Sequence, residues 1–161
     1  MLKLLIPLAI ALAMPATAAA QDTRVTMAAG ACQSALPVFD GVVRKRPLAV
    51  QNDGTTRTFI TCGLEGRFGA AESSSLIFVG LTNNADADAS VSCTLVDGRN
   101  RISDPVYRAK SINVPANADV VELAWTSIDN EGVDFIYPAI SCSIPPGIGI
   151  KAVGQSFVPT P

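Results

Sequence analysis

The chain contains no histidine, and this absence excludes several classes of enzyme. A Ser-His-Asp or Cys-His centre needs an imidazole to take and return a proton. Zinc sites without histidine need paired cysteines, and no two of the four cysteines are close enough in sequence to form such a pair. No glycine-rich loop between a strand and a helix is present to hold a phosphate. We therefore predict a non-enzymatic protein with no catalytic residue, no metal and no cofactor.

Aromatic and charged residues are also scarce. The chain has one Trp, two Tyr and six Phe, which is few for a sugar-binding platform. Its 12 basic and 14 acidic residues give a net charge of −2, and without Lys3 the balance of 11 against 14 gives −3. The basic run of Arg44, Lys45 and Arg46 has no interleaved aromatic residue, so it indicates a solvated strand end or loop. We predict no nucleic-acid partner.

Long apolar runs are absent after residue 20. Before it, a basic start at Lys3 is followed by apolar residues 4–14 and by small residues up to Ala20. This is the layout of a cleaved signal peptide over residues 1–20, with cleavage between Ala20 and Gln21. The apolar run is about half of the ~20 residues that span a bilayer. We predict a secreted or periplasmic protein with no membrane span after cleavage.

Helical periodicity is absent too, and short alternating segments take its place. The pattern apolar–small–Cys–small–apolar occurs three times, at residues 60–64, 91–95 and 140–144. Because successive side chains of a strand point to opposite faces, Cys62, Cys93 and Cys142 each share a face with their apolar neighbours. The pattern predicts three strands whose thiols face the core.

Four cysteines in an exported chain favour two disulfides, for which three pairings exist. We favour Cys32–Cys62, which would join the N-terminal segment to the first strong strand. We also favour Cys93–Cys142, which would join the two most similar strands.

The fold class predicted is all-β. Eight or nine short strands separated by turn signals are typical of an antiparallel β-sandwich or a jelly-roll-like fold, with a closed barrel as the main rival. In the segment 106–114, Arg108 and Lys110 share the parity of Ile112, and a bulge near Ser111 would resolve this conflict. We predict a flexible arm over residues 21–31 and a single domain over residues 32–158.

The order of these segments resembles a group of small, uncharacterised exported bacterial proteins. The shared features are an N-terminal Cys, an apolar-Thr-Cys strand, the strand Val-Ser-Cys-Thr-Leu, and Ile-Ser-Cys-Ser-Ile-Pro before the last strand. The resemblance covers most of the chain after the leader. It implies an exported all-β domain with four cysteines, and it implies no activity.

A polar turn at residues 83–88 offers oxygen ligands in the alternating pattern that suits Ca²⁺. The candidate ligands are Asn83, Asp86 and Asp88. The turn lacks the terminal Glu and internal Gly of an EF-hand loop. The alternative is a solvated hairpin turn, in which Asn and Asp satisfy backbone groups.

A second acidic cluster comprises Asp129, Glu131 and Asp134, near Trp125 and Tyr137 in sequence. Two carboxylates at a suitable spacing could hydrolyse a glycoside, and the aromatic rings could stack on a sugar. The alternative is a charged surface turn, with Trp125 in the core.

Together these features predict an exported, non-enzymatic binding or structural module with a protein or glycan partner. One rival is a subunit of an extracellular coat or pilus-type assembly. The other is a carbohydrate-binding module or a hydrolase that uses carboxylates alone. Exposed aromatic residues on a concave sheet face would favour a ligand-binding module, whereas two carboxylates converging in a pocket would favour an enzyme.

Overall fold

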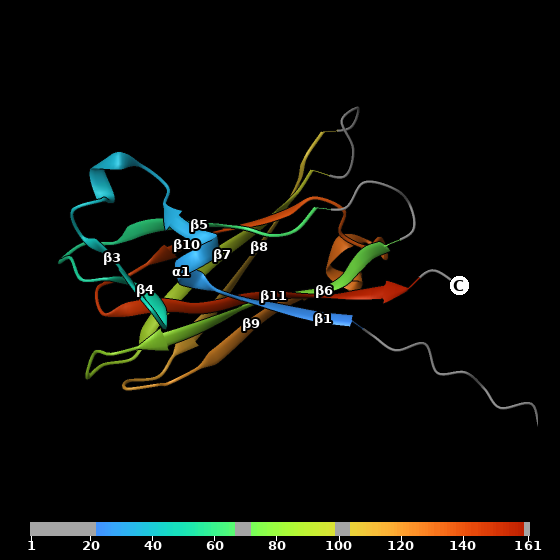
Figure 1. The fold of residues 1–161 in the computed structure, drawn as a ribbon. Helices are drawn as coiled ribbons and strands as arrows, with labels where there is room; N and C mark the ends of the chain where they lie inside the picture. The colour runs from blue at the N-terminus through green and yellow to red at the C-terminus, as the bar shows by residue number, and fades with distance from the viewer. Residues whose placement is uncertain (1–21, 67–71, 99–103, 160–161) are drawn as a thin grey trace, which may run out of the picture.

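The computed structural model describes residues 22–66, 72–98 and 104–159, which form two antiparallel sheets packed face to face (Figure 1). The predicted signal peptide lies outside these residues. Within them, no helix is long and apolar enough to cross a membrane. The six-stranded sheet contains β1 (Asp22–Met27), β3 (Val43–Arg46), β4 (Ala49–Asn52), β6 (Glu72–Asn83), β9 (Val121–Thr126) and β11 (Ile148–Pro159). The five-stranded sheet contains β2 (Cys32–Ser34), β5 (Thr58–Gly63), β7 (Ala89–Asp97), β8 (Val106–Val114) and β10 (Pro138–Ile144).

The strand order is that of a jelly roll. The strands β4–β11–β6–β9 of one sheet face β5–β10–β7–β8 of the other, and the chain crosses repeatedly between them. The all-β sandwich with a jelly-roll-like order is thus confirmed, and the two sheets stay separate rather than closing into a barrel. The eleven described strands exceed the eight or nine expected, because β1, β2 and β3 extend the eight-strand jelly roll at its N-terminal side.

The core forms between the two sheets from the alternating residues of each strand. The three repeated segments behave as their pattern predicts: Val91, Cys93 and Leu95 are fully buried on β7, while Ser90 and Ser92 are exposed. The equivalent positions within β5 and β10 are also buried, whereas Leu64, just beyond the end of β5, is half-buried. Each such apolar side chain stabilises the fold by roughly 1.5–3 kcal/mol through removal from water.

The structure contains two disulfides, Cys32–Cys62 and Cys93–Cys142, which is the pairing that the sequence favours. In each pair the two cysteines are direct register partners on neighbouring strands, β2 with β5 and β7 with β10. Both bridges therefore lie inside the five-stranded sheet. Among the described residues, no disulfide joins one sheet to the other, so apart from the connecting segments of the chain their association depends on the buried apolar surface.

The N-terminal segment differs from its prediction. Residues 22–27 form β1, which pairs with β11 from Asp22↔Phe157 to Met27↔Ala152. A short helix, α1 (Ala28–Ala31), then carries the chain across to β2 in the other sheet. The structure thus places a paired strand and a helix where the sequence suggests a flexible arm. The partner strand lies about 130 positions further along the chain, so the local pattern cannot reveal it.

The predicted bulge near Ser111 is wrong, because β8 pairs with β7 without interruption from Ala89↔Val114 to Asp97↔Val106. Arg108 and Lys110 do share the inward parity of Ile112. β8 is an edge strand, however, so these two cations lie at the open side of the sandwich and reach across to the segment after β9.

Two turns that lead from the six-stranded to the five-stranded sheet each contain a buried asparagine whose side-chain amide donates to two backbone carbonyls. Asn52, the last residue of β4, donates from Nδ2 to Thr56 O (2.8 Å) and to Ile144 O of the opposite sheet (3.1 Å). Asn83, the last residue of β6, likewise donates to Ala87 O (2.8 Å) and to Val114 O (3.1 Å). Each asparagine thus satisfies a strand-end carbonyl that would otherwise be buried without a partner.

Candidate functional site

The predicted calcium ligands serve the turn that contains them. Asn83 is 1% exposed and its amide is engaged as described above. Asp88 accepts hydrogen bonds from the backbone N–H of Ala116 (2.9 Å) and from Asn113 Nδ2 (3.0 Å), and these bonds lower its pKa. Asp86 is exposed. In the part of the chain that the structure describes, no group of three His, Cys, Asp or Glu side chains is placed to hold a metal ion. The geometry supports a turn in which Asn and Asp satisfy backbone groups, but because β6 and β7 belong to different sheets this turn is a crossover and not a hairpin.

Asp129 has a capping role. It lies in the short 3₁₀ helix η2 (Ser127–Asn130), where its Oδ2 accepts the backbone N–H of Thr126 at 2.7 Å. Its Oδ1 lies 2.8 Å from Lys110 Nζ. Lys110 first, and the Thr126 N–H second, lower the pKa of Asp129 below its ordinary value. The carboxylate is therefore held as an anion by structural partners.

The other two carboxylates of the cluster are separately engaged. Glu131 forms an exposed ion pair with Arg108 at 2.6 Å. Asp134 accepts a hydrogen bond from Ser73 Oγ at 2.7 Å. Each of the three carboxylates is thus bonded to a different partner, which links β6, β8 and the segment after β9.

The Asp129→Asn variant is expected to lower the free energy of unfolding by about 1 kcal/mol at pH 7. The pKa of Asp129 is lower in the folded state than its ordinary value of 3.8. At a pH above 3.8 the ionised carboxylate therefore stabilises the fold, and this contribution disappears as the pH falls through the lowered pKa. Urea denaturation should therefore show a gap between wild type and variant at pH 7 that closes toward pH 2. Glu131→Gln, on a 73% exposed side chain, is the control and should change little.

The aromatic residues near the cluster do not form a sugar platform. Trp125 is fully buried and donates from Nε1 to Arg108 O at 3.0 Å. Tyr137 is half-buried and lies against Gly66 and Gly98. The basic run is likewise engaged in part, because Arg44 and Arg46 on the edge strand β3 lie near Asp53, at 3.8 and 3.0 Å.

The outer side of the five-stranded sheet is a surface that the sequence did not single out; we name it the hydroxyl face. Its five strands all lie within the described residues, and they contribute no carboxylate to it. The register sets its polar groups in rows across the sheet, and Thr61 donates to Ser141 at 3.4 Å. Nine neutral polar side chains make up the face: Gln33, Thr61, Ser90, Ser92, Thr94, Ser111, Asn113, Ser141 and Ser143.

Two exposed aromatic residues lie on opposite sides of the hydroxyl face. Phe59 on β5 is 46% exposed, and Tyr107 on β8 is 62% exposed. Phe39 supports the ring of Phe59, with ring centroids 6.3 Å apart. From the strand spacing and rise, the register places the two aromatic residues roughly 20 Å apart along a diagonal. The alternation of buried and exposed side chains in β5 and β8 predicts that both aromatic residues face outward. The sheet order is needed to show that they lie on the same surface.

A second feature is a pocket of about 310 Å³ between the sheets at the N-terminal edge; we name it the edge pocket. Strand β1, helix α1, the segment after β5 and strand β11 surround it. Because Arg24 and Gln155 are register partners on β1 and β11, their side chains lie on the same face. The lining residues are Arg24, Thr26, Gly30, Ala31, Gly63, Leu64, Glu65 and Gln155.

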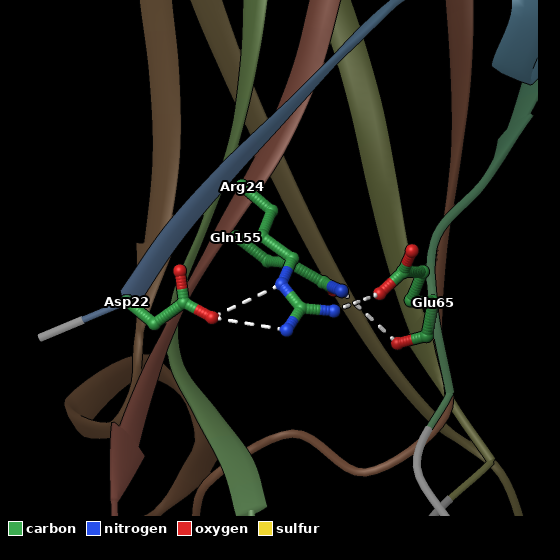
Figure 2. A network of polar contacts seen from close by, with 4 residues as sticks. All are labelled: Asp22, Arg24, Glu65 and Gln155. Carbon is green, nitrogen blue, oxygen red and sulfur yellow. Dashed lines mark hydrogen bonds and ion pairs between the residues drawn. The ribbon is translucent and has the colours of Figure 1, made fainter.

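A polar network closes one side of the edge pocket (Figure 2). Arg24 lies between two carboxylates, with Nη2 3.0 Å from Asp22 and Nη1 2.8 Å from Glu65. These carboxylates, Glu65 first, raise the pKa of Arg24. The guanidinium also lies over the ring of Phe157, 5.2 Å from its centroid. The network fixes the Arg24 side chain and joins β1 to the other sheet.

Gln155 is the unusual member of this network. It is 2% exposed and donates from Nε2 to Glu65 O at 3.1 Å. Its Oε1 is buried without a hydrogen-bond partner. Such an unsatisfied acceptor costs about 1–3 kcal/mol, and a buried polar group of this kind needs an explanation. No local pattern in the sequence selects Arg24 or Gln155, because Arg24 lies in the predicted arm and its register partner is far along the chain.

No protein-family model and no curated protein matches the chain. Among solved structures, the chain is similar to a CBM61 domain in complex with β-1,4-galactotriose, with a TM-score of 0.38, 9% identity, and coverage of 84% of this chain and 86% of that one. It is also similar to a CBM4 structure, with a TM-score of 0.35, 10% identity and 86% coverage of each chain. At such scores the jelly-roll assignment rests on the strand order of this chain itself.

Proposed function

We propose that the protein is an exported, non-enzymatic binding module whose hydroxyl face docks on a neutral polysaccharide. The observation that carries this proposal is the coincidence, on one sheet face, of neutral hydrogen-bonding side chains and two exposed aromatic rings. Signal-like residues 1–20 and two buried disulfides support a location outside the cytoplasm.

The chemistry of the hydroxyl face suits a chain of sugars. Serine and threonine hydroxyls both donate and accept, so they can exchange hydrogen bonds with sugar hydroxyls in either direction. Phe59 and Tyr107 offer flat apolar surfaces for the C–H faces of sugar rings. Two charged side chains are bonded to this surface: Arg57 donates to Ser90 O at 2.7 Å and to Ser143 O at 3.2 Å, and Asp88 accepts a hydrogen bond from Asn113 Nδ2 at 3.0 Å. A neutral ligand therefore fits better than a charged one.

The small side chains give this surface its shape. Across the central strands, Ser92, Ser143 and Thr94 project little beyond the backbone, whereas the two rings stand higher at its sides. Five strands at their usual spacing make the face roughly 19 Å wide. A flat face of this width can contact several sugar units at once, with modest affinity for each.

Affinity electrophoresis and pull-down on a panel of neutral polysaccharides test the proposal. The protein should bind at least one of them, and the double variant Phe59→Ala/Tyr107→Ala should lose at least tenfold in affinity. Ile128→Ala is the matched control, because Ile128 is an 85% exposed apolar residue in η2, away from the face.

Absence of binding to every polysaccharide, or equal binding by the double variant and wild type, would overturn the proposal. The same samples distinguish the rival classes. Release of reducing ends would indicate a hydrolase, and growth of particle size with concentration in light scattering would indicate an assembly subunit.

A further inference from the structure

We propose that the edge pocket is a separate binding site for one small neutral polyol, of the size of a single sugar ring. This inference goes beyond the proposed function, because the pocket lies between the sheets. Of its lining residues, Gly63 alone is on the outer side of the five-stranded sheet. Its volume of about 310 Å³ is at the lower end of the range for small-molecule sites.

The first argument is the acceptor of Gln155. Gln155 lines the pocket, is almost wholly buried, and its Oε1 has no donor. The amide is oriented by its own bond from Nε2 to Glu65 O, so Oε1 is fixed as the acceptor. A hydroxyl donor entering the pocket is the group that the site lacks.

The second argument is the fixed donor beside that acceptor. Asp22 and Glu65 engage three of the five N–H groups of Arg24, at Nε, Nη2 and Nη1, which leaves two N–H groups. Phe157 lies beneath the guanidinium and limits its movement. Because Arg24 and Gln155 are opposite each other on neighbouring strands, their side chains start about 5 Å apart. Adjacent hydroxyls of one ring can donate to Gln155 and accept from Arg24.

The third argument concerns charge and shape. The positive Arg24 is flanked by the negative Asp22 and Glu65, so a strong anion would be repelled by the carboxylates and a cation by the guanidinium. Thr26 adds a hydroxyl, and Leu64 and Ala31 supply apolar wall. A ligand with hydroxyls on an apolar ring matches this mixture, whereas an ion or a hydrocarbon does not.

Two variants test whether the pocket binds a ligand or whether its polar network only stabilises the fold. Gln155→Leu removes the acceptor and keeps the side-chain size, so it should abolish polyol binding while leaving the fold intact. Gly30→Leu places an apolar side chain at the pocket wall, and a Cβ at Gly30 meets nothing within 4 Å, so the side chain can begin there without a clash. Gly41→Leu is the matched control, because Gly41 also has open space for a Cβ but does not line the pocket.

The measurement is two-dimensional NMR of the ¹⁵N-labelled protein titrated with D-glucose, D-galactose, D-mannose and D-xylose, each alone. At least one sugar should give saturable shifts at Thr26, Gly30 and Gln155. Gln155→Leu and Gly30→Leu should weaken that binding at least tenfold, whereas Gly41→Leu and Phe59→Ala should not.

Three outcomes would overturn the inference: no saturable shift at the pocket with any sugar, unchanged affinity in Gly30→Leu, or tighter binding of acetate or putrescine than of the sugars. Because Phe59→Ala reports on the hydroxyl face and Gly30→Leu on the edge pocket, failure of one proposal is distinguishable from failure of the other.

Discussion

Replacing Cys93 and Cys142 together by alanine is expected to lower the free energy of unfolding by about 4 kcal/mol. The bridge joins residues 49 positions apart, so it restricts a large loop in the unfolded chain. Both sulfurs lie in the core, and alanine leaves part of their volume empty, which adds to the loss. Urea denaturation of the oxidised wild type and the double variant, followed by fluorescence of Trp125, measures the difference.

The second disulfide provides the comparison. Cys32–Cys62 spans 30 positions, and its removal should cost about half a kcal/mol less on loop entropy alone. A loss below about 1 kcal/mol for the Cys93/Cys142 pair would contradict the view that this bridge stabilises the five-stranded sheet.

Trp125→Ala is expected to destabilise the fold by about 3–5 kcal/mol. The residue is among the largest fully buried side chains, and its removal also leaves Arg108 O without the Nε1 donor. Thermal unfolding monitored by far-ultraviolet circular dichroism should show a large decrease in melting temperature. Tyr107→Ala, at a 62% exposed aromatic residue, should change stability by no more than about 0.5 kcal/mol.

This contrast decides which aromatic residue can report on ligand binding. A variant of Trp125 would lose binding through loss of the fold, so it gives no information about a sugar platform. Tyr107 and Phe59 are exposed and can be removed without a core cavity. A small effect of Trp125→Ala on stability would show that the core packing around β9 is looser than described above.

The core strands could be predicted from the sequence because their signal is local. In residues 91–95, period-2 alternation alone determines which side chains are buried, and the structure places Val91, Cys93 and Leu95 accordingly. The sequence also indicated the disulfide pairing, since it marked residues 93 and 142 as the centres of matching strands. Local alternation of this kind is a property of each strand and needs no knowledge of its neighbours.

The candidate sites could not be predicted, because they depend on which strands are neighbours. The hydroxyl face exists only when β5, β10, β7 and β8 lie side by side in that order. The edge pocket depends on pairing between residues near the two ends of the chain, Arg24 with Gln155. In β8, alternation suggests that charged residues cannot face inward, and this rule holds for a strand covered on both sides. Because β8 is an edge strand, Arg108 and Lys110 reach solvent and acidic partners from the inward side.

The pairing of β1 with β11 also determines how the protein responds to mechanical force. Asp22 and Phe157 are register partners, so the ends of these two strands lie side by side at one end of the sandwich (Figure 1). A force that pulls these ends apart acts on the hydrogen bonds between β1 and β11 one pair at a time, from Asp22 toward Met27. Because the pairs break in sequence, each step needs only a low force. On the N-terminal side this opening stops at Cys32, which is bonded to Cys62. The first extension under load therefore detaches β1 and opens the edge pocket, while the five-stranded sheet and its hydroxyl face stay intact.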